Sequence, residues 1–218
     1  MRLSDKQIAV YGAGGFGRGI AWLAQVCGNE VVCFIDDDEL KIGKIFNEIP
    51  VLTLEEARKK YPHTRVVVAV NEPKARESIV SKVINSGFTF ATLVHPHVEL
   101  SPWVKIGEGS IIREGCNFSV NIVLGRHVIL NMDCTIGHDA VLDDYVTLAP
   151  GAHISGYNHL GKRVNIGTGA VVINGTQEEP LVIGDDAIVG AGACVIRPVP
   201  PGVTVVGVPA RPIEKRLR

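Results

Sequence analysis

The 218-residue chain has few aromatic residues and almost no excess of charge. Aromatic residues make up 6% of the chain, and 22 Lys and Arg stand against 23 Asp and Glu. This balance argues against the basic surface of a nucleic-acid-binding protein, and a hydrophobic share of 46% argues against disorder. We therefore expect a folded protein that does not bind nucleic acid.

Long hydrophobic runs are also missing. The longest, such as residues 66–70, are far too short to cross a bilayer. The N-terminus lacks a basic segment followed by a long apolar one, which is the pattern of a signal peptide. We therefore expect a cytoplasmic protein with no membrane insertion.

Cysteine pairs with the spacing Cys-x-x-Cys do not occur, and the number of cysteines is odd. Both facts argue against a disulfide framework or a zinc finger, and we expect most of these residues to be reduced and buried. They are Cys27, Cys33, Cys116, Cys134 and Cys194.

What the chain does contain is an excess of aliphatic residues, chiefly Val and Ile, together with 24 Gly. Stiff β-branched side chains fit a pleated surface better than a helix bundle. The composition therefore favours β-structure.

The first 93 residues alternate apolar runs with helical patterns. Strands are expected at 6–11, 30–35, 65–70 and 88–93, and helices at 18–26, after 53 and at 73–85. Thr53 and Glu56 have the spacing of a capping box, which predicts the start of the middle helix. Strands that alternate with helices imply a parallel sheet. We expect a Rossmann-like half domain over residues 1–93.

A glycine turn follows the first expected strand. Gly12, Gly14 and Gly17 have the Gly-x-Gly-x-x-Gly spacing of a nucleotide-binding turn, and Asp36 and Asp37 end the next strand, where a carboxylate accepts hydrogen bonds from a ribose or a base. The domain is large enough for one mononucleotide half only, which favours a nucleotide or nucleotide sugar over a dinucleotide. The alternative is a glycine turn that only packs its helix on the strand.

From residue 94 onwards, large apolar residues recur at every sixth position. The next position is often Gly, and the fifth is small or β-branched, as at Cys116, Cys134 and Ala140. After residue 177 the phase slips by five residues at 178–182, which predicts a loop. The large residues are Val94, Leu100, Ile106, Ile112, Phe118, Leu124, Leu130, Ile136, Leu142, Leu148, Ile154, Leu160, Ile166 and Val172, followed after the slip by Ile183, Val189 and Val195.

This pattern resembles the hexapeptide repeat of the left-handed parallel β-helix, in which three hexads form one coil. We expect this fold over residues 94–218, with the C-terminal tail at its end. Cys116 and Cys134 are three hexads apart, so they should stack in adjacent coils. Most proteins with this repeat are acyltransferases, but some are hydratases or scaffolds.

His138 and Asp139 are the best candidates for chemistry in the repeat. A carboxylate beside a His fixes its tautomer and supports the imidazolium, as general-base catalysis requires. Gly156 lies three hexads after His138, so its N–H is a candidate oxyanion donor. His153 and His159 are second candidates, and a zinc site built from several His remains an alternative, although no spacing favours it.

The whole chain also resembles the bacterial nucleotide-amino-sugar N-acetyltransferases and the related sialic-acid O-acetyltransferases. The resemblance implies acetyl-CoA as co-substrate, no metal, a homotrimer with active sites between subunits, and a role in polysaccharide biosynthesis. The N-terminal domain would hold the nucleotide of the sugar substrate. The matching segments are Val10-Tyr-Gly-Ala-Gly-Gly15, Phe34-Ile-Asp-Asp37, Leu93-Val-His-Pro96, Val128-Ile-Leu-Asn131, Ile136-Gly-His-Asp139, Ala149-Pro-Gly-Ala152 and Val206-Gly-Val-Pro-Ala-Arg211.

Carried over by position, the resemblance makes His138 the base, Asp139 its orienting acid and Asn131 a neighbour of the acceptor. The nucleotide and sugar contacts fall on Gly14, Gly15, Asp36 and Asp37, and on Phe16 and Asn71, where relatives more often carry His and Gly. The acetyl-CoA contacts fall on Thr147, Thr168, Ala191 and Arg211. The loop inserted at residues 178–182 is expected near the cleft that binds acetyl-CoA.

The favoured hypothesis is transfer of an acetyl group to the amine of a nucleotide-linked 4-amino-4,6-dideoxysugar, with His138 as general base. O-acetylation of a sugar such as a sialic acid is the nearest alternative. A nucleotide-sensing trimeric scaffold is a more remote one.

Overall fold

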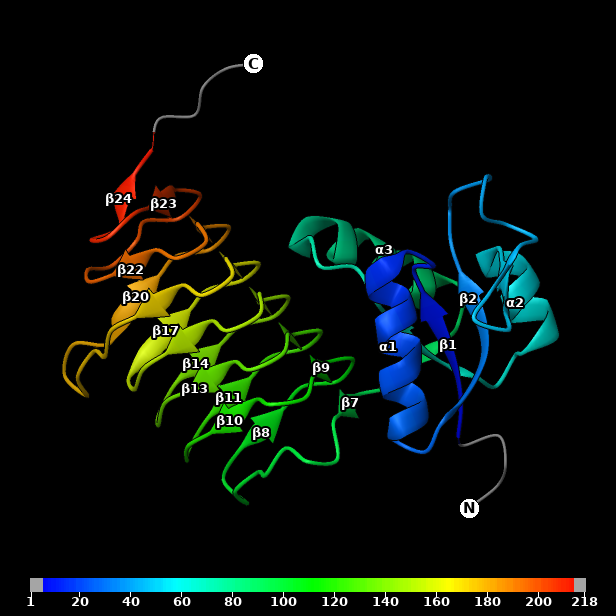
Figure 1. Cartoon of the computed structure of the whole chain (residues 1–218), viewed down its shortest axis with the longest axis horizontal. Coiled ribbons are helices and arrows are strands. Elements are labelled where there is room, and N and C mark those ends of the chain that lie inside the picture. Colours follow the sequence, from blue (N-terminus) through cyan, green and yellow to red (C-terminus); the bar gives the residue numbers. More distant parts are fainter. Residues whose placement is uncertain (1–5, 214–218) are drawn as a thin grey trace. The chain divides into compact units, whose positions relative to one another are not determined.

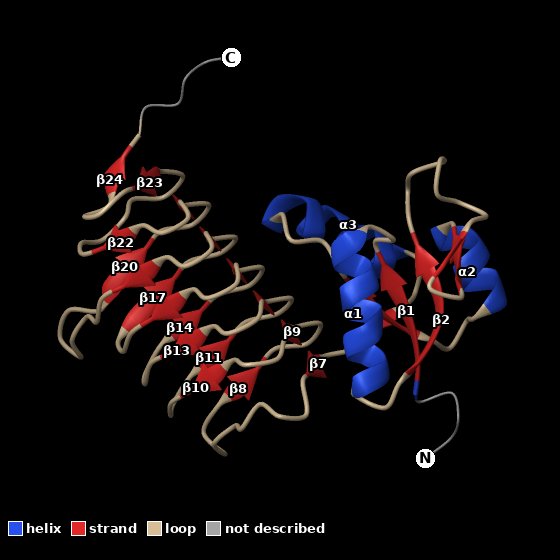
Figure 2. Ribbon diagram, viewed as in Figure 1, coloured by secondary structure: helices blue, strands red, loops and turns tan. Residues whose placement is uncertain are grey.

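The computed structural model describes residues 6–213. The chain forms two compact units that divide between Pro96 and His97, three residues beyond the boundary expected after residue 93. Figures 1 and 2 show helices and strands in the N-terminal unit and stacked short strands in the C-terminal unit. Within residues 6–213, no helix has both the length and the apolar character that crossing a membrane requires.

The N-terminal unit is built on a six-stranded sheet with the order β3-β4-β2-β1-β5-β6. Neighbouring strands pair in parallel, except β3 and β4, which are antiparallel. The strands are β1 (Gln7–Tyr11), β2 (Glu30–Ile35), β3 (Ile45–Phe46), β4 (Ile49–Leu52), β5 (Arg65–Val68) and β6 (Thr89–Phe90).

Three helices connect these strands, as the sequence predicts. Helix α1 (Gly15–Val26) packs on β1 and β2, α2 (Leu54–Lys60) on β2 and β4, and α3 (Pro73–Asn85) on β5. The capping box of α2 is confirmed: the Thr53 hydroxyl accepts the Glu56 N–H at 3.1 Å, and the Glu56 carboxylate accepts the Thr53 N–H at 2.9 Å. The Rossmann-like α/β organisation is therefore confirmed.

Helix α1 begins three residues before the predicted start at 18. The glycine segment forms the first turn of this helix, because the Arg18 N–H donates to the Gly14 carbonyl at 3.0 Å. The β3–β4 hairpin is not predicted by the sequence. It turns at Asn47 and Glu48, both with positive φ, and a glutamate at such a position gives little sign of a hairpin. The strand expected at 88–93 is instead two short strands, β6 and β7 (Leu93–Val94).

The C-terminal unit is a parallel β-helix with three faces, and it confirms the left-handed hexapeptide fold expected from the repeat. In this unit, face 1 contains β9 (Ile111–Ile112), β12 (Ile129–Leu130), β15 (Thr147–Leu148), β18 (Asn165–Ile166), β21 (Ile188–Val189) and β23 (Thr204–Val206), with β24 (Arg211–Pro212) antiparallel at its end. Face 2 contains β10 (Asn117–Phe118), β13 (Thr135–Ile136), β16 (His153–Ile154), β19 (Val171–Val172) and β22 (Cys194–Val195). Face 3 contains β8 (Lys105–Ile106), β11 (Val123–Leu124), β14 (Val141–Leu142), β17 (Asn158–Leu160) and β20 (Leu181–Ile183).

The register of the strands follows the predicted coil length. Ile129 pairs with Thr147, three hexads later. Asn165 pairs with Ile188, so the coil between them holds three hexads and the five extra residues that the phase slip predicts. The extra residues extend the connection from β19 to β20, where Thr176 and Glu179 close a turn through two hydrogen bonds.

The interior of the β-helix is filled by alternating large and small residues. The large residues at every sixth position from Leu124 to Val172 are at most 2% exposed, and the small ones between them, such as Ala140 and Ala152, are fully buried. Leu100 is an exception: it is 38% exposed and lies in no strand, because the first strand of the C-terminal unit is β8. Within this unit, the apolar spacing alone therefore does not tell which of its positions lie in strands.

Cys116 and Cys134 stack in adjacent coils, as their spacing predicts. Both are buried, and their neighbours Asn117 and Thr135 are paired across β10 and β13. The Cys116 thiol donates to the Asn131 carbonyl at 3.0 Å. The neighbouring Cys116 thiol and burial both raise the pKa of the Cys134 thiol. Both side chains are at most 4% exposed, so these two residues belong to the core.

Candidate functional site

A cavity of about 390 Å³ lies where the carboxyl ends of β1, β2 and β5 meet in the N-terminal unit. In this sheet order, β1 connects to β2 on one side and has β5 on the other, which is the position where open α/β sheets bind ligands. The volume falls in the range of small-molecule sites. The cavity is lined by Tyr11, Gly12, Gly14, Gly15, Phe16, Gly17, Asp36, Asp37, Lys41, Ala69, Val70, Asn71 and Ile79.

The glycines of the turn fall into two classes. A Cβ on Gly17 would overlap the Gly12 carbonyl oxygen, and Gly12 has a φ of +110°, so packing alone requires both. A Cβ on Gly14 would have no atom within 4 Å, and one on Gly15 would meet only the end of the Arg18 side chain, at 3.9 Å. The space beside Gly14 and Gly15 is open to a ligand, which packing does not explain.

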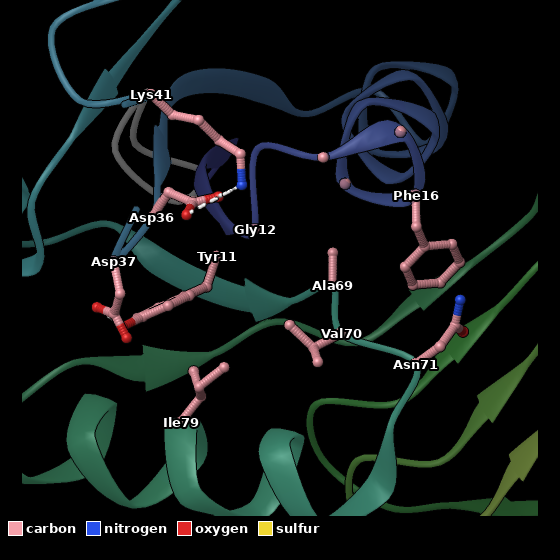
Figure 3. A pocket seen from close by; sticks show the side chains of 13 residues that line it. Tyr11, Gly12, Phe16, Asp36, Asp37, Lys41, Ala69, Val70, Asn71 and Ile79 are labelled. Atoms are coloured by element: carbon pink, nitrogen blue, oxygen red, sulfur yellow. Dashed lines mark hydrogen bonds and ion pairs between the residues drawn. The ribbon is translucent and has the colours of Figure 1, made fainter. Parts of the chain in front are cut away.

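Asp36 is bound by groups of the protein itself. Its carboxylate accepts the Ala13 N–H at 2.8 Å and the Asp38 N–H at 2.9 Å, and it pairs with the Lys41 ammonium at 3.2 Å. The Asp36 side chain is only 12% exposed. Figure 3 shows Lys41 reaching over to this carboxylate. The Asp36 carboxylate therefore fixes the glycine turn, and its expected role in nucleotide binding stays a prediction.

Asp37 is more accessible, with 57% of its side chain exposed. The Tyr11 hydroxyl donates to one carboxylate oxygen at 2.7 Å, and the Lys82 ammonium donates to the other at 2.8 Å. The bond from Lys82 lowers the pKa of Asp37, with a further contribution from Tyr11. Burial, followed by the bond to Asp37, raises the pKa of Tyr11. Asp37 is thus an oriented, ionised acceptor at the cavity. Tyr11 lies within the matching segment 10–15 but had no role assigned to it, and no sequence motif pointed to Lys82.

Phe16 and Asn71 line the opposite end of the same cavity. Figure 3 shows their side chains facing each other, away from Asp36 and Asp37. The two positions at which the sequence departs from its resemblance to the acetyltransferases therefore lie together.

In the β-helix, His138 and Asp139 follow β13, at the turn from face 2 to face 3. Nδ1 of His138 lies 2.8 Å from Oδ2 of Asp139. An ionised carboxylate only accepts, so Nδ1 carries the proton and the lone pair is left on Nε2. The hydrogen bond with His138 is also the largest cause of the lowered pKa of Asp139. Half of the His138 side chain is exposed, so the imidazole is not enclosed by the protein.

Gly156 lies beside this imidazole, as the coil length predicts. A Cβ on Gly156 would be 2.7 Å from Nε2 of His138. Within residues 6–213, the Gly156 N–H has no acceptor. The structure thus places a proton acceptor, its carboxylate and a backbone donor together, which is the arrangement that acyl transfer uses.

Two further residues at this turn were missed by sequence analysis. Nδ2 of Asn121 donates to Oδ1 of Asp139 at 3.1 Å. The ring of Tyr157 meets the His138 ring edge-to-face, with centroids 5.0 Å apart. Each lies three hexads from Asp139 along the chain. Counting one coil in both directions from Asp139, as was done forwards from His138 to find Gly156, would have found them.

The other histidine candidates have different surroundings. Nε2 of His159 lies 3.0 Å from Oδ2 of Asp143, a second His–acid pair that the sequence hides because the two residues are not adjacent. His159 is flanked in its sheet by Val141 and Val182, so no open glycine lies beside it. His153 bonds to the hydroxyl of Thr135 at 3.0 Å. His159 thus has an acid but no open glycine beside it, and His153 pairs with a hydroxyl group instead of an acid. Only one of the groups that accompany His138, at most, is present at each.

Two of the residues carried over by resemblance point into the protein. The side chain of Asn131 is buried and donates to the Leu148 carbonyl at 2.9 Å, which ties two coils together. Thr147 lies within β15 and is 3% exposed. In one chain, the Asn131 side chain is therefore not placed to contact an acceptor, and the Thr147 side chain is not placed to contact acetyl-CoA. An acetyl-CoA contact through the Thr147 backbone stays a prediction.

Thr168 and Ala191 are exposed and stacked at the turn from face 1 to face 2, where the Gly192 N–H donates to the Thr168 carbonyl at 2.8 Å. This is not the turn of His138, which joins faces 2 and 3. The inserted loop, by contrast, joins the same two faces as the His138 turn, two coils further along. Arg211 is exposed on β24 and, with Arg197, lines a cavity of about 240 Å³.

Comparison with known proteins identifies the family of the chain. The family described as the PglD N-terminal domain matches residues 7–83. The chain is 34% identical, over 94% of its length and 96% of the relative's, to a GDP-perosamine N-acetyltransferase of Escherichia coli O157:H7. The chain belongs to the nucleotide-amino-sugar N-acetyltransferase family.

Two solved structures of this family superpose on almost the whole chain. WeeI from Acinetobacter baumannii is 38% identical, with a TM-score of 0.87 over 94% of this chain and 99% of its own. A histidine-to-asparagine mutant of perosamine N-acetyltransferase from Caulobacter crescentus, solved with CoA and GDP-perosamine, is 28% identical, with a TM-score of 0.88 over 96% and 97% of the chains. Family membership confirms acetyl transfer from acetyl-CoA as the class of reaction. No group of three or more potential metal-binding side chains occurs within residues 6–213 of one chain.

Proposed function

We propose that the protein transfers the acetyl group of acetyl-CoA to the amine of a nucleotide-linked 4-amino-4,6-dideoxysugar, with His138 as general base. The observation that carries the assignment of the base is the position of its Nε2. This atom has a lone pair, belongs to a half-exposed side chain, and lies beside the backbone of Gly156, whose N–H has no acceptor among residues 6–213.

In this reaction Nε2 of His138 takes a proton from the attacking amine as its nitrogen bonds to the carbonyl carbon of the thioester. Asp139 stabilises the imidazolium that forms, and the Gly156 N–H donates to the oxyanion. When the C–S bond breaks, the imidazolium returns its proton to the sulfur, so CoA leaves as the thiol. A positioned base contributes a factor of roughly 10² to 10⁴ in rate.

The nucleotide part of the substrate fits the cavity of the N-terminal unit. The exposed, ionised carboxylate of Asp37 supports a role as acceptor of hydrogen bonds from the ribose or the base, and the open side of Gly14 and Gly15 suits the diphosphate at the start of α1. The sugar would then extend towards Phe16 and Asn71. GDP-perosamine, which the Caulobacter relative binds, is the first substrate to test.

For acetyl-CoA, we propose contacts along the turn of Thr168 and Ala191, with Arg211 and Arg197 near the phosphates. Two guanidinium groups at one cavity fit the negative charge of CoA. Because this turn and that of His138 are different turns of one chain, a neighbouring copy is needed to bring them together, which supports a homotrimer with sites between subunits. Nucleotide sugars and acetyl-CoA are made in the cytoplasm, where we place the reaction.

The assignment is tested by comparing His138→Ala with His153→Ala, a matched change on the next coil. With acetyl-CoA and GDP-, UDP- or dTDP-linked 4-amino sugars, we expect release of the CoA thiol to fall roughly 10² to 10⁴-fold for His138→Ala only. Near wild-type turnover by this variant, or an equal loss in both, would exclude His138 as the base. Failure of the wild-type protein to acetylate any of these amines would exclude the proposed substrate class.

A further inference from the structure

The acid of the His138–Asp139 pair is held from the preceding coil. Asn121 and Asp139 occupy the same position in successive turns, and both have a positive φ, of 57° and 56°. In this stack, Nδ2 of Asn121 points at Oδ1 of Asp139, while Oδ2 of the same carboxylate faces Nδ1 of His138. Each carboxylate oxygen therefore has a side-chain partner of its own.

The partial exposure of Asp139 gives this contact a role. One third of its side chain is exposed, so packing alone does not fix the rotation of its carboxylate. A partner on Oδ1 removes this freedom. An amide is a suitable partner because it donates at every pH and adds no charge beside the imidazole. Other titratable groups at this turn are His138 itself and Tyr157, whose ring packs against the imidazole.

We propose that Asn121 is a positioning residue of the acetyl transfer: its amide holds the Asp139 carboxylate in the orientation that keeps the His138 proton on Nδ1. The proposal rests on the proposed role of His138 as base. Without the amide, Asp139 rotates towards solvent, and the imidazole loses the partner that selects its tautomer. Part of the population then carries the proton on Nε2 and cannot accept one from the amine.

The experiment compares Asn121→Ala and Asn121→Asp with Asn117→Asp in the full-length protein. Asn121→Asp keeps the shape but sets a second carboxylate against Asp139. Asn117 is the matched control, because it is an exposed asparagine that donates to the Gly115 carbonyl at 2.8 Å. Asn117→Asp adds the same charge without touching the pair.

The first measurement is the tautomer of His138, from the ring nitrogen shifts of protein labelled with ¹⁵N-histidine; the signals are assigned by their loss in His138→Gln. We expect the proton on Nδ1 in the wild type and in Asn117→Asp, and a mixture of tautomers in both Asn121 variants. The second measurement is kcat, which should fall up to about 10²-fold in both Asn121 variants, while the KM for acetyl-CoA stays constant.

If the His138 tautomer were unchanged in both Asn121 variants, the proposal would be overturned. This holds even if kcat falls, because a loss of kcat without a change of tautomer has another cause. A loss of kcat in the Asn121 variants no larger than that in Asn117→Asp would also overturn the proposal. The tautomer is measured without substrate. It therefore tests Asn121 even if the wild-type protein acetylates none of the amino sugars, an outcome that would count against the proposed function alone.

Discussion

Nε2 of His138 occupies the space that a side chain at Gly156 would fill. A Cβ at position 156 would lie 2.7 Å from Nε2 and 2.8 Å from Cε1, closer than real Cβ atoms approach other atoms. The backbone of Gly156 has no positive φ that would itself require glycine. The imidazole is therefore the reason for glycine at this position, so the change Gly156→Ala acts on the imidazole.

We predict that Gly156→Ala lowers kcat and leaves the melting temperature almost unchanged. The methyl group meets the end of a half-exposed side chain, which can rotate away at little cost in folding free energy. The displaced Nε2 no longer faces the amine, and a shift of about 1 Å is enough to cost on the order of 10² in rate. Turnover and thermal unfolding of the two proteins test this.

Gly19→Ala is the control for this change, because a Cβ on Gly19 would have no atom within 4 Å and the residue is inside a helix. It should retain full turnover. If Gly156→Ala retained it as well, the close approach of His138 to residue 156 would have no part in catalysis.

Asp36 and Asp37 should respond differently to removal of charge. Asp36→Asn replaces one acceptor with an NH₂ group beside N–H donors, so we predict a loss of about 1–3 kcal/mol in stability together with weaker nucleotide binding. Asp37→Asn should weaken binding with little effect on stability, since that side chain is exposed. Calorimetric titration with GDP, UDP and dTDP, together with thermal unfolding, separates the two effects. Equal loss of stability in both variants would contradict this division of roles.

The glycine turn gives a matched pair of its own. In Gly17→Ala the new methyl group overlaps the backbone at Gly12, so we predict a severely destabilised N-terminal unit. In Gly15→Val the new Cβ has room, since only the flexible end of Arg18 lies within 4 Å of it. The Val side chain enters the cavity instead, and we predict normal thermal unfolding with loss of nucleoside-diphosphate binding. Full binding by a folded Gly15→Val protein would favour a turn that serves packing only.

The fold could be predicted largely from the sequence because its rules are local and periodic. In the coils, a large residue at every sixth position and a small one between them directly indicate what faces the interior, as Leu130 and Cys134 show. The hairpin at Asn47 and Glu48 escaped prediction because a positive φ at these residues depends on pairing across the sheet. Leu100 keeps the period without lying in a strand, since apolar spacing alone does not reveal which positions are paired.

The members of the candidate site were predictable only where a single spacing along the chain was enough to bring two residues together. His138, Asp139 and Gly156 follow from adjacency and from the three-hexad coil. The partners of a carboxylate are harder to foresee: Asp36 and Asp37 are neighbours in the same motif and both line the cavity, yet the first accepts backbone N–H groups and the second is far more exposed. Side-chain direction at the end of a strand decides this, and it depends on contacts with Tyr11 and Lys41 from other parts of the chain.

Cys33 gives a prediction at alkaline pH. It is fully buried in β2, and burial raises the pKa of its thiol from 9.0 to about 12. Between these two values the unfolded chain releases a proton that the native protein keeps. The free energy of unfolding should therefore fall as pH rises, with a Cys33 contribution of about 1.4 kcal/mol per pH unit. The stability that depends on the protonated thiol is fully present below pH 9.0.

Chemical denaturation of the wild type and of Cys33→Ala across this pH range isolates that contribution. Tyr11, whose pKa is also raised by burial, adds a decline above about pH 10. It is present in both proteins, so it cancels in the difference between their slopes. Cys33→Ala should be less stable at neutral pH because of the cavity it leaves, yet lose stability more slowly with rising pH. Equal slopes in the wild type and Cys33→Ala would mean that the native protein lets Cys33 ionise as readily as the unfolded chain does.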